Sequence, residues 1–220
     1  MKAIVCDVRR ALAGRWFWAA LLATTAALYL SIGQAADALM DDTQNLRFTL
    51  SELLLMALCG DFGMLTLPAL SALPFAAQAL HEIKCGAVRP AVFRAGRRMW
   101  ILGKAAGCIL SGMVLQAAAA GLLGLILYAV RGGSILLEIN AEFNAALLRR
   151  MRCGGIWASV GCVMALATET SSAAHLGPLC LCYALMMLGK RFFPAAVIWQ
   201  QFYYTIIAYF CKDVFSRNLC

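Results

Sequence analysis

Residues able to perform catalysis are scarce in this chain and lack the spacing that known motifs require. The only histidines are His81 and His175, and His81-Glu82 is not followed by another histidine four residues later, so the zinc-protease helix is absent. Cys180 and Cys182 are too close for a standard redox dithiol. No GxxxxGK(S/T) phosphate loop occurs, which excludes nucleotide hydrolysis by that mechanism. We therefore expect no catalytic residue, metal or cofactor in this chain.

Two acidic residues, Asp61 and Glu169, lie beside apolar stretches where a proton or ion pathway could use them. A charged side chain at the centre of a membrane helix costs roughly 2.5–3.5 kcal/mol, so such residues are rare unless they have a function. The simpler interpretation is that both lie at the water interface and cap helices. We favour that interpretation and leave the pathway as the alternative.

The composition is that of a membrane protein. Hydrophobic residues make up 63% of the chain and charged residues only 14%, with a mean hydropathy of +0.78, which leaves too little polar surface for a soluble domain. The apolar residues come in blocks of about 20, the length of a spanning helix. The net charge of +8 comes from Lys and Arg at the block ends, which indicates topology signals and lipid headgroup contacts, not nucleic-acid binding.

These blocks predict an all-α integral membrane protein with a single permease domain over residues 1–220 and no ATPase domain. Six transmembrane helices are expected, at 16–33, 62–80, 101–128, 153–168, 176–188 and 195–211. The basic start places the N-terminus in the cytoplasm by the positive-inside rule, and six spans return the C-terminus to the same side. A cleaved signal ending near Gln34 is a less favoured alternative. Arg149, Arg150 and Arg152 would fall on the outer side, beside a possible interfacial helix at 135–148, and a five-helix alternative removes that conflict.

Two patterns inside the predicted spans concern helix geometry. Pro68 and Pro74 fall in the second span and predict kinks or local unwinding, which membranes tolerate where neighbouring helices satisfy the freed carbonyls. Gly103, Gly107 and Ser111 recur every four residues in the third span. Small residues at this spacing let another helix approach closely, so we expect a packing face there.

The region from the second to the third span resembles the membrane subunits of type-2 ATP-binding-cassette exporters. In that family a proline-bearing second span leads into an acidic and basic cytoplasmic helix before a third span that begins with lysine. The matching segments here are PALSALPF at 68–75, Glu82 and Gly86, FRAGRRMWILGK at 93–104, and the N-terminal DVRRAL at 7–12 entering WFW at 16–18.

The resemblance implies a permease subunit that pairs with a second permease, as a homo- or heterodimer, and binds a separate ATPase subunit that carries the ATP. A short cytoplasmic coupling helix between spans 2 and 3 would dock on that ATPase through Glu82, Arg94, Arg97 and Arg98. The competing interpretation is that these arginines only hold lipid headgroups. The implied location is the plasma membrane of a prokaryote.

Two other classes of function stay open at this point. A non-transporting membrane anchor or assembly protein would have no ATPase partner and no effect on substrate retention. An intramembrane enzyme would lose its activity when one polar residue, such as Asp61 or His175, is replaced. Nothing in the sequence indicates what an exporter of this kind would carry.

Overall fold

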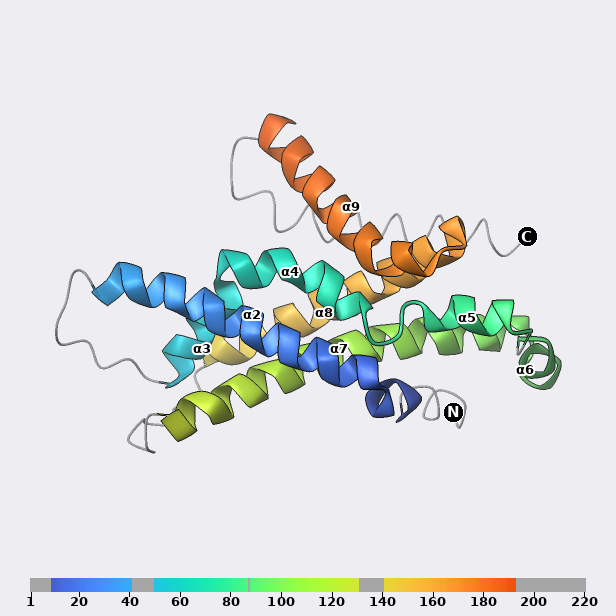
Figure 1. Ribbon diagram of the computed structural model, residues 1–220, viewed down its shortest axis with the longest axis horizontal. Coiled ribbons are helices and arrows are strands. Elements are labelled where there is room, and N and C mark those ends of the chain that lie inside the picture. Colours follow the sequence, from blue (N-terminus) through green and yellow to red (C-terminus); the bar gives the residue numbers. More distant parts are fainter. Residues whose placement is uncertain (1–8, 41–49, 87, 131–140, 193–220) are drawn as a thin grey trace.

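The computed structural model describes residues 9–40, 50–86, 88–130 and 141–192, and these parts of the chain are helical with no strand (Figure 1). This agrees with the predicted all-α class. The helices are α2 (Arg15–Met40), α3 (Leu50–Cys59), α4 (Asp61–Ala72), α5 (Gln78–Lys84), α6 (Val88–Ala95), α7 (Arg97–Val130), α8 (Ala141–Thr168) and α9 (Ser171–Phe192).

Four of these helices are long and apolar enough to cross a membrane. The candidate spans are Arg15–Gly33, Arg98–Val130, Ala141–Thr168 and Ser171–Leu188. They contain the predicted spans at 101–128, 153–168 and 176–188 and nearly coincide with the one at 16–33, so helical, membrane-embedded character is confirmed. The predicted span at 195–211 lies outside the described residues, and the count of six stays a prediction.

Within the predicted span at 62–80, where Pro68 and Pro74 predict kinks or local unwinding, the helix is interrupted at Pro74. Helix α4 ends at Ala72, a turn follows, and α5 begins at Gln78. Pro74 lies in this turn and has no N–H to donate, and the backbone on either side tightens to bonds from Leu73 N to Leu70 O and from Gln78 N to Phe75 O. Pro68, by contrast, is buried inside α4 without ending the helix.

A second break separates α3 from α4. Gly60 has an extended backbone (φ −64°, ψ 144°) and ends the helical path between Cys59 and Asp61. At about 1.5 Å per residue, α4 is roughly 18 Å long, too short to cross 30 Å of hydrocarbon by itself. The stretch from Leu50 to Lys84, which includes the predicted second span, is therefore a discontinuous helix built from α3, α4 and α5.

The helix that contains the predicted fourth span at 153–168 is longer than expected, because α8 begins at Ala141 and has 28 residues. From Ala141 onward, the segment expected to form a separate interfacial helix is the first part of α8. Arg149, Arg150 and Arg152 were expected in an outer segment, but they lie within this helix. These arginines therefore need not lie in an outer loop. Arg150 is buried in the bundle, whereas Arg149 and Arg152 are exposed on the surface of α8.

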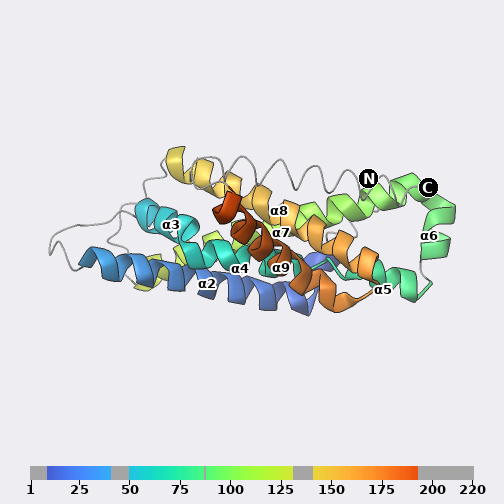
Figure 2. The same ribbon diagram turned by 90° about the horizontal axis from the view of Figure 1, so that it is seen from above.

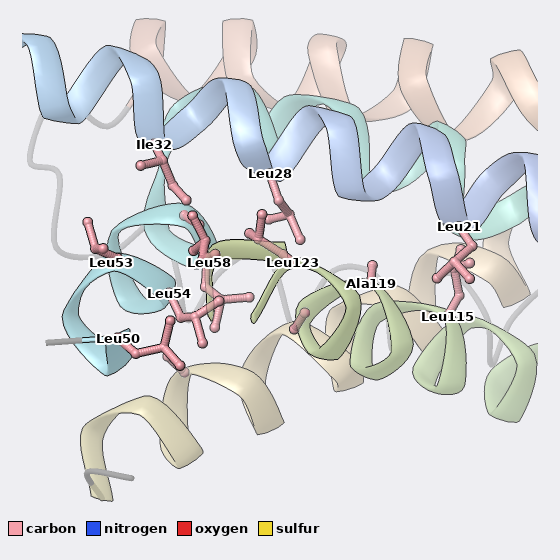
Figure 3. Close-up of a cluster of buried hydrophobic side chains, with 14 of the residues drawn as sticks. Leu21, Leu28, Ile32, Leu50, Leu53, Leu54, Leu58, Leu115, Ala119 and Leu123 are labelled. Carbon is pink, nitrogen blue, oxygen red and sulfur yellow. The ribbon is translucent and has the colours of Figure 1, made fainter. Parts of the chain in front are cut away.

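The short helix α4 lies in the middle of the bundle, packed against α2, α7, α8 and α9 (Figures 1 and 2). Helix α3 packs on α2, α7 and α8. A core of leucine and alanine side chains from α2, α3 and α7, including Leu28, Leu54, Leu115 and Leu123, fills the space between these helices. Figure 3 shows part of this cluster, with Leu28 and Leu123 facing one another across α2 and α7.

Helices α5 and α6 lie at one end of the bundle, beside the start of α7 (Figures 1 and 2). The start of α2 and the connection from α8 to α9 lie toward the same end. The start of α8, the end of α7 and α3 lie toward the opposite end. The segment predicted to couple spans 2 and 3 is thus a pair of short helices, α5 and α6, at an end of the molecule.

Candidate functional site

Arg150 is the centre of a buried polar network at the break between α3 and α4. Its side chain is only 4% exposed. The guanidinium donates from Nη1 to the carbonyl of Leu58 at 2.8 Å, from Nη2 to the carbonyl of Gly63 at 2.9 Å, and from Nε to Oε1 of Gln116 at 3.1 Å. One side chain on α8 therefore binds the end of α3, the start of α4 and the middle of α7.

The network continues through neutral side chains. Gln116 is fully buried and donates from Nε2 to Oγ of Ser71 on α4, at 2.9 Å. On the other side of α4, the N–H of Gly63 donates to Oγ of Ser31 on α2 at 2.8 Å, and that hydroxyl donates to the carbonyl of Ala27 at 3.1 Å. Side chains from α2, α4, α7 and α8 thus meet at one level of the bundle.

Glycines make this meeting possible, because they let the helix backbones come close. A Cβ at Gly154 of α8 would lie 2.6 Å from Cγ of Gln116 and 2.9 Å from the carbonyl oxygen of Gly112 on α7. A Cβ at Gly60 would lie 2.8 Å from Cβ of Ser31. Any larger residue would push the helices apart and separate the donors from their acceptors.

The network lies near the middle of the long helices. Gln116 and Arg150 are each within about two turns of the midpoints of α7 and α8, and the Gly112–Gly154 contact brings these midpoints together. Backbone that leaves the helix at membrane depth is tolerated only where protein or a cavity surrounds it. Discontinuous helices with polar groups at their broken ends form the binding sites of many transporters.

A second polar cluster holds α5 in place. Nζ of Lys104 on α7 donates to Oε1 of Glu82 at 2.8 Å, and Nη1 of Arg10 lies 3.5 Å from the same oxygen. Lys104 is nearly buried, and its Nζ also lies 5.6 Å from the centre of the Phe75 ring. Nearby, Lys84 donates to the carbonyl of Glu169 at 2.8 Å, which links the end of α5 to the connection between α8 and α9.

The predicted docking residues are therefore not equivalent. The Glu82 carboxylate is engaged inside the chain, whereas Arg98 is exposed at the start of α7. Arg94 lies on α6 and Arg97 begins α7, but their side chains lie outside the described part of the structure. An additional exposed residue is Phe93 on α6, 89% exposed.

Other predicted residues have clear positions. Gly103, Gly107 and Ser111 are all buried, as a packing face requires, although the closest approach of α7 to α8 is at the neighbouring Gly112. Glu169 is exposed in the turn between α8 and α9, with φ of 55°. Asp61 is the first residue of α4, and its side chain lies outside the described residues.

The residues considered for catalysis do not form a site. His81 is exposed next to Cys85, and half-buried His175 lies on α9. Cys180 is exposed while Cys182 is buried, so the two thiols lie in different surroundings. Among the residues that the structure describes, no group of three or more His, Cys, Asp or Glu side chains could hold a metal.

No family model, curated protein or solved structure matches this chain.

Proposed function

We propose that this chain is the permease subunit of an ATP-binding-cassette exporter, powered by an ATPase subunit on a separate chain. The observation that carries the proposal is the attachment of α5 to the bundle through Glu82 and Lys104, 2.8 Å apart. The α5–α6 pair lies at one end of the molecule, and the Glu82–Lys104 ion pair fixes α5 to α7. A movement that a partner imposes on this helix pair can therefore be transmitted to α7.

The path from α5 into the bundle is short. Helix α5 follows α4 after the turn at Pro74, and α4 contacts α2, α7, α8 and α9. The Glu82–Lys104 pair adds a direct connection to α7, and the Lys84–Glu169 bond adds one to the end of α8. A displacement of α5 would therefore reach the Arg150 network through several contacts at once.

In this proposal the predicted docking residues divide into two roles. Glu82 holds the α5–α6 pair to the permease. Arg94, Arg97 and Arg98 contact the ATPase, together with Phe93, whose aromatic ring is exposed on α6. Aromatic and arginine side chains at the centre of an interface contribute most of the binding free energy in many complexes. The competing interpretation for all four residues is contact with lipid headgroups.

The remaining parts of the proposal concern the arrangement in the membrane. The permease has six spans with both termini in the cytoplasm, in the plasma membrane of a prokaryote, and pairs with a second permease of the same or a different sequence. The exposed basic residues of the α5 end, which include Arg9, Arg10, Lys84 and Arg98, support a cytoplasmic position for that end by the positive-inside rule.

The test is ATPase stimulation in a reconstituted system. The chain is placed in nanodiscs with the cassette ATPase encoded in the same genome, and ATP hydrolysis is compared with and without the permease. We expect Phe93→Ser combined with Arg98→Glu to reduce binding of the ATPase roughly tenfold or more, as loss of interface hot spots does. Leu102→Ser, at an exposed position on α7, is the matched control and should bind normally.

A membrane anchor or assembly protein predicts a different set of results. It would neither bind nor stimulate the ATPase, and its deletion would leave substrate retention unchanged. Equal binding of the ATPase by the wild type and the Phe93/Arg98 variant would show that α6 does not contact the ATPase.

A further inference from the structure

A groove on the surface between α7 and α8 is the strongest unassigned feature of the molecule. Its volume is about 470 Å³, and its walls consist of Ile109, Met113, Arg149, Arg152, Ile156 and Ser159. The two residues from α7 are apolar, and the four from α8 are spaced three or four apart, on one face of the helix. The arginines are at the end of this stripe nearer to the start of α8.

Gly155 of α8 lets the α7 side chains that line the groove pack closely onto the α8 backbone. A Cβ there would lie 3.0 Å from Cγ2 of Ile109 and 3.0 Å from Cγ of Met113. The side chains of α7 therefore lie directly over the α8 backbone and form an apolar wall. Ile156 extends this apolar surface on the α8 side.

The charge in the groove is of one sign. Arg149 and Arg152 are both exposed, and within the described ranges no carboxylate lies at ion-pair distance from either guanidinium. Nε of Arg149 donates to the carbonyl of Ala145 at 3.3 Å, so this side chain extends toward the start of α8. The two cations are therefore available to an anion that approaches from that side.

The depth of these arginines suits a group at the membrane interface. From Cys153 to Thr168, α8 has no charged side chain, and at about 1.5 Å per residue this stretch is about 24 Å long, most of a hydrocarbon core of about 30 Å. Arg152 and Arg149 lie within about one turn before this stretch, near the core boundary, and long arginine side chains reach outward from such positions to the headgroup region. The apolar part of the groove continues inward from there.

We propose that this groove binds an anionic phospholipid, with its phosphate at Arg149 and Arg152 and an acyl chain along Ile109, Met113 and Ile156. Guanidinium groups bind phosphate oxygens through paired hydrogen bonds. The apolar wall favours a lipid over a free anion, because only the lipid has an acyl chain to pack against it. A second copy of this chain would bring another pair of cations to the same place, which disfavours it as the occupant. The site does not depend on transport or on an ATPase.

The test is lipid binding by the full chain in detergent, measured by native mass spectrometry. Phosphatidylglycerol and phosphatidylcholine with identical acyl chains are titrated in turn. We expect phosphatidylglycerol to bind roughly tenfold more tightly or better, because each cation near the headgroup favours the anionic lipid. The double variant Arg149→Gln/Arg152→Gln should bind both lipids equally. The control Arg9→Gln/Arg15→Gln removes two exposed arginines elsewhere and should keep the preference.

Two further measurements separate a lipid from a simple anion. Ile156→Trp fills the groove while both arginines stay, so it should lose phosphatidylglycerol binding. Water-soluble glycerol phosphate should fail to displace the lipid, since it has no chain. The proposal is overturned if the Gln variant keeps the preference, if the Trp variant binds normally, if glycerol phosphate displaces the lipid, or if the control loses the preference as well.

Discussion

The break between α3 and α4 exposes backbone groups that neighbouring side chains satisfy. A helix end leaves its last carbonyls and first N–H groups without intrahelical partners. Here the Leu58 carbonyl near the end of α3 accepts from Arg150, and the Gly63 N–H at the start of α4 donates to Ser31. The break is therefore stabilised by α8 on one side and α2 on the other. A buried arginine needs acceptors for its N–H groups, and Arg150 finds them at this break.

We expect Arg150→Met to destabilise the protein by about 3 kcal/mol. The variant leaves the acceptors at Leu58, Gly63 and Gln116 without their donor, and a buried polar group that loses its partner costs about 1–3 kcal/mol. Arg150→Lys should recover only part of the loss, because a lysine ammonium lacks the planar fork that reaches these acceptors together. Unfolding in mixed micelles measures the change. Arg98→Met, at an exposed position, is the control and should stay within about 0.5 kcal/mol.

Two glycines on facing helices should respond to alanine with opposite signs. Gly154→Ala places a Cβ 2.6 Å from Cγ of Gln116, so α7 and α8 must move apart, at a cost of about 1–3 kcal/mol. Gly121 on α7 is exposed with nothing within 4 Å of its added Cβ, and alanine there should be neutral or stabilising, by up to about 1 kcal/mol. Thermal unfolding of both variants measures this. A similar loss at both positions would show that helix packing is not the cause.

At the scale of elements, the attachment of α5 to α7 can be tested without any partner. Glu82→Gln removes the carboxylate from nearly buried Lys104, so α5 should open more often. We expect amide hydrogen exchange in α5 to accelerate roughly tenfold, the effect of weakening local stability by about 1.4 kcal/mol. Exchange in α3, toward the opposite end of the bundle, should stay unchanged and serves as an internal control.

A charge exchange between the two positions strengthens this test. Glu82→Lys with Lys104→Glu rebuilds the pair in reverse, so α5 should regain part of its protection. Full recovery is not expected, because Arg10 would then face a lysine instead of a carboxylate. Equal exchange in the single and double variants would indicate that this ion pair does not hold α5.

A helix can be predicted from the sequence when residues within that helix determine where it begins and ends. The α2 and α7 spans follow from apolar length alone, since each block is about long enough to cross the membrane, whereas the α9 helix begins at Ser171, before the short block predicted at 176–188. The interruption of the second span follows only in part. The two prolines predict a kink or local unwinding, but not that the helix continues past Pro68 and ends before Pro74. The early part of α8 was missed because three closely spaced arginines resemble a polar segment.

The polar network could not be predicted, since its members are distant in sequence. The acceptors of Arg150 are 34, 87 and 92 residues away. One local signal was present, because Gln116 is a polar residue within a long apolar stretch, where such side chains need an internal partner. Identifying Arg150 as that partner requires the α7–α8 crossing, which only tertiary structure provides.

The whole molecule has two chemically different ends. Exposed basic residues collect near the α5 end, among them Arg9, Arg15, Lys84 and Arg98. Toward the opposite end, α3 and α8 carry exposed Glu52 and Glu142 in their first turns, and exposed Arg149 and Arg152 follow further along α8. Basic residues flanking spans stay in the cytoplasm, whereas acidic residues have little influence on orientation. This asymmetry predicts which end of the molecule faces the cytoplasm.

Cysteine labelling decides this orientation, because Cys85 is exposed at the basic end. In a variant whose other cysteines are replaced, a membrane-impermeant maleimide should leave Cys85 unmodified in intact cells and modify it in inside-out vesicles. A second variant with Glu142→Cys as its single cysteine reports the opposite end and should give the reverse pattern. Labelling of Cys85 from outside would put the α5–α6 pair in the wrong compartment for a cytoplasmic ATPase. The exporter proposal would then fail, whereas the phospholipid groove would still stand on its own measurement.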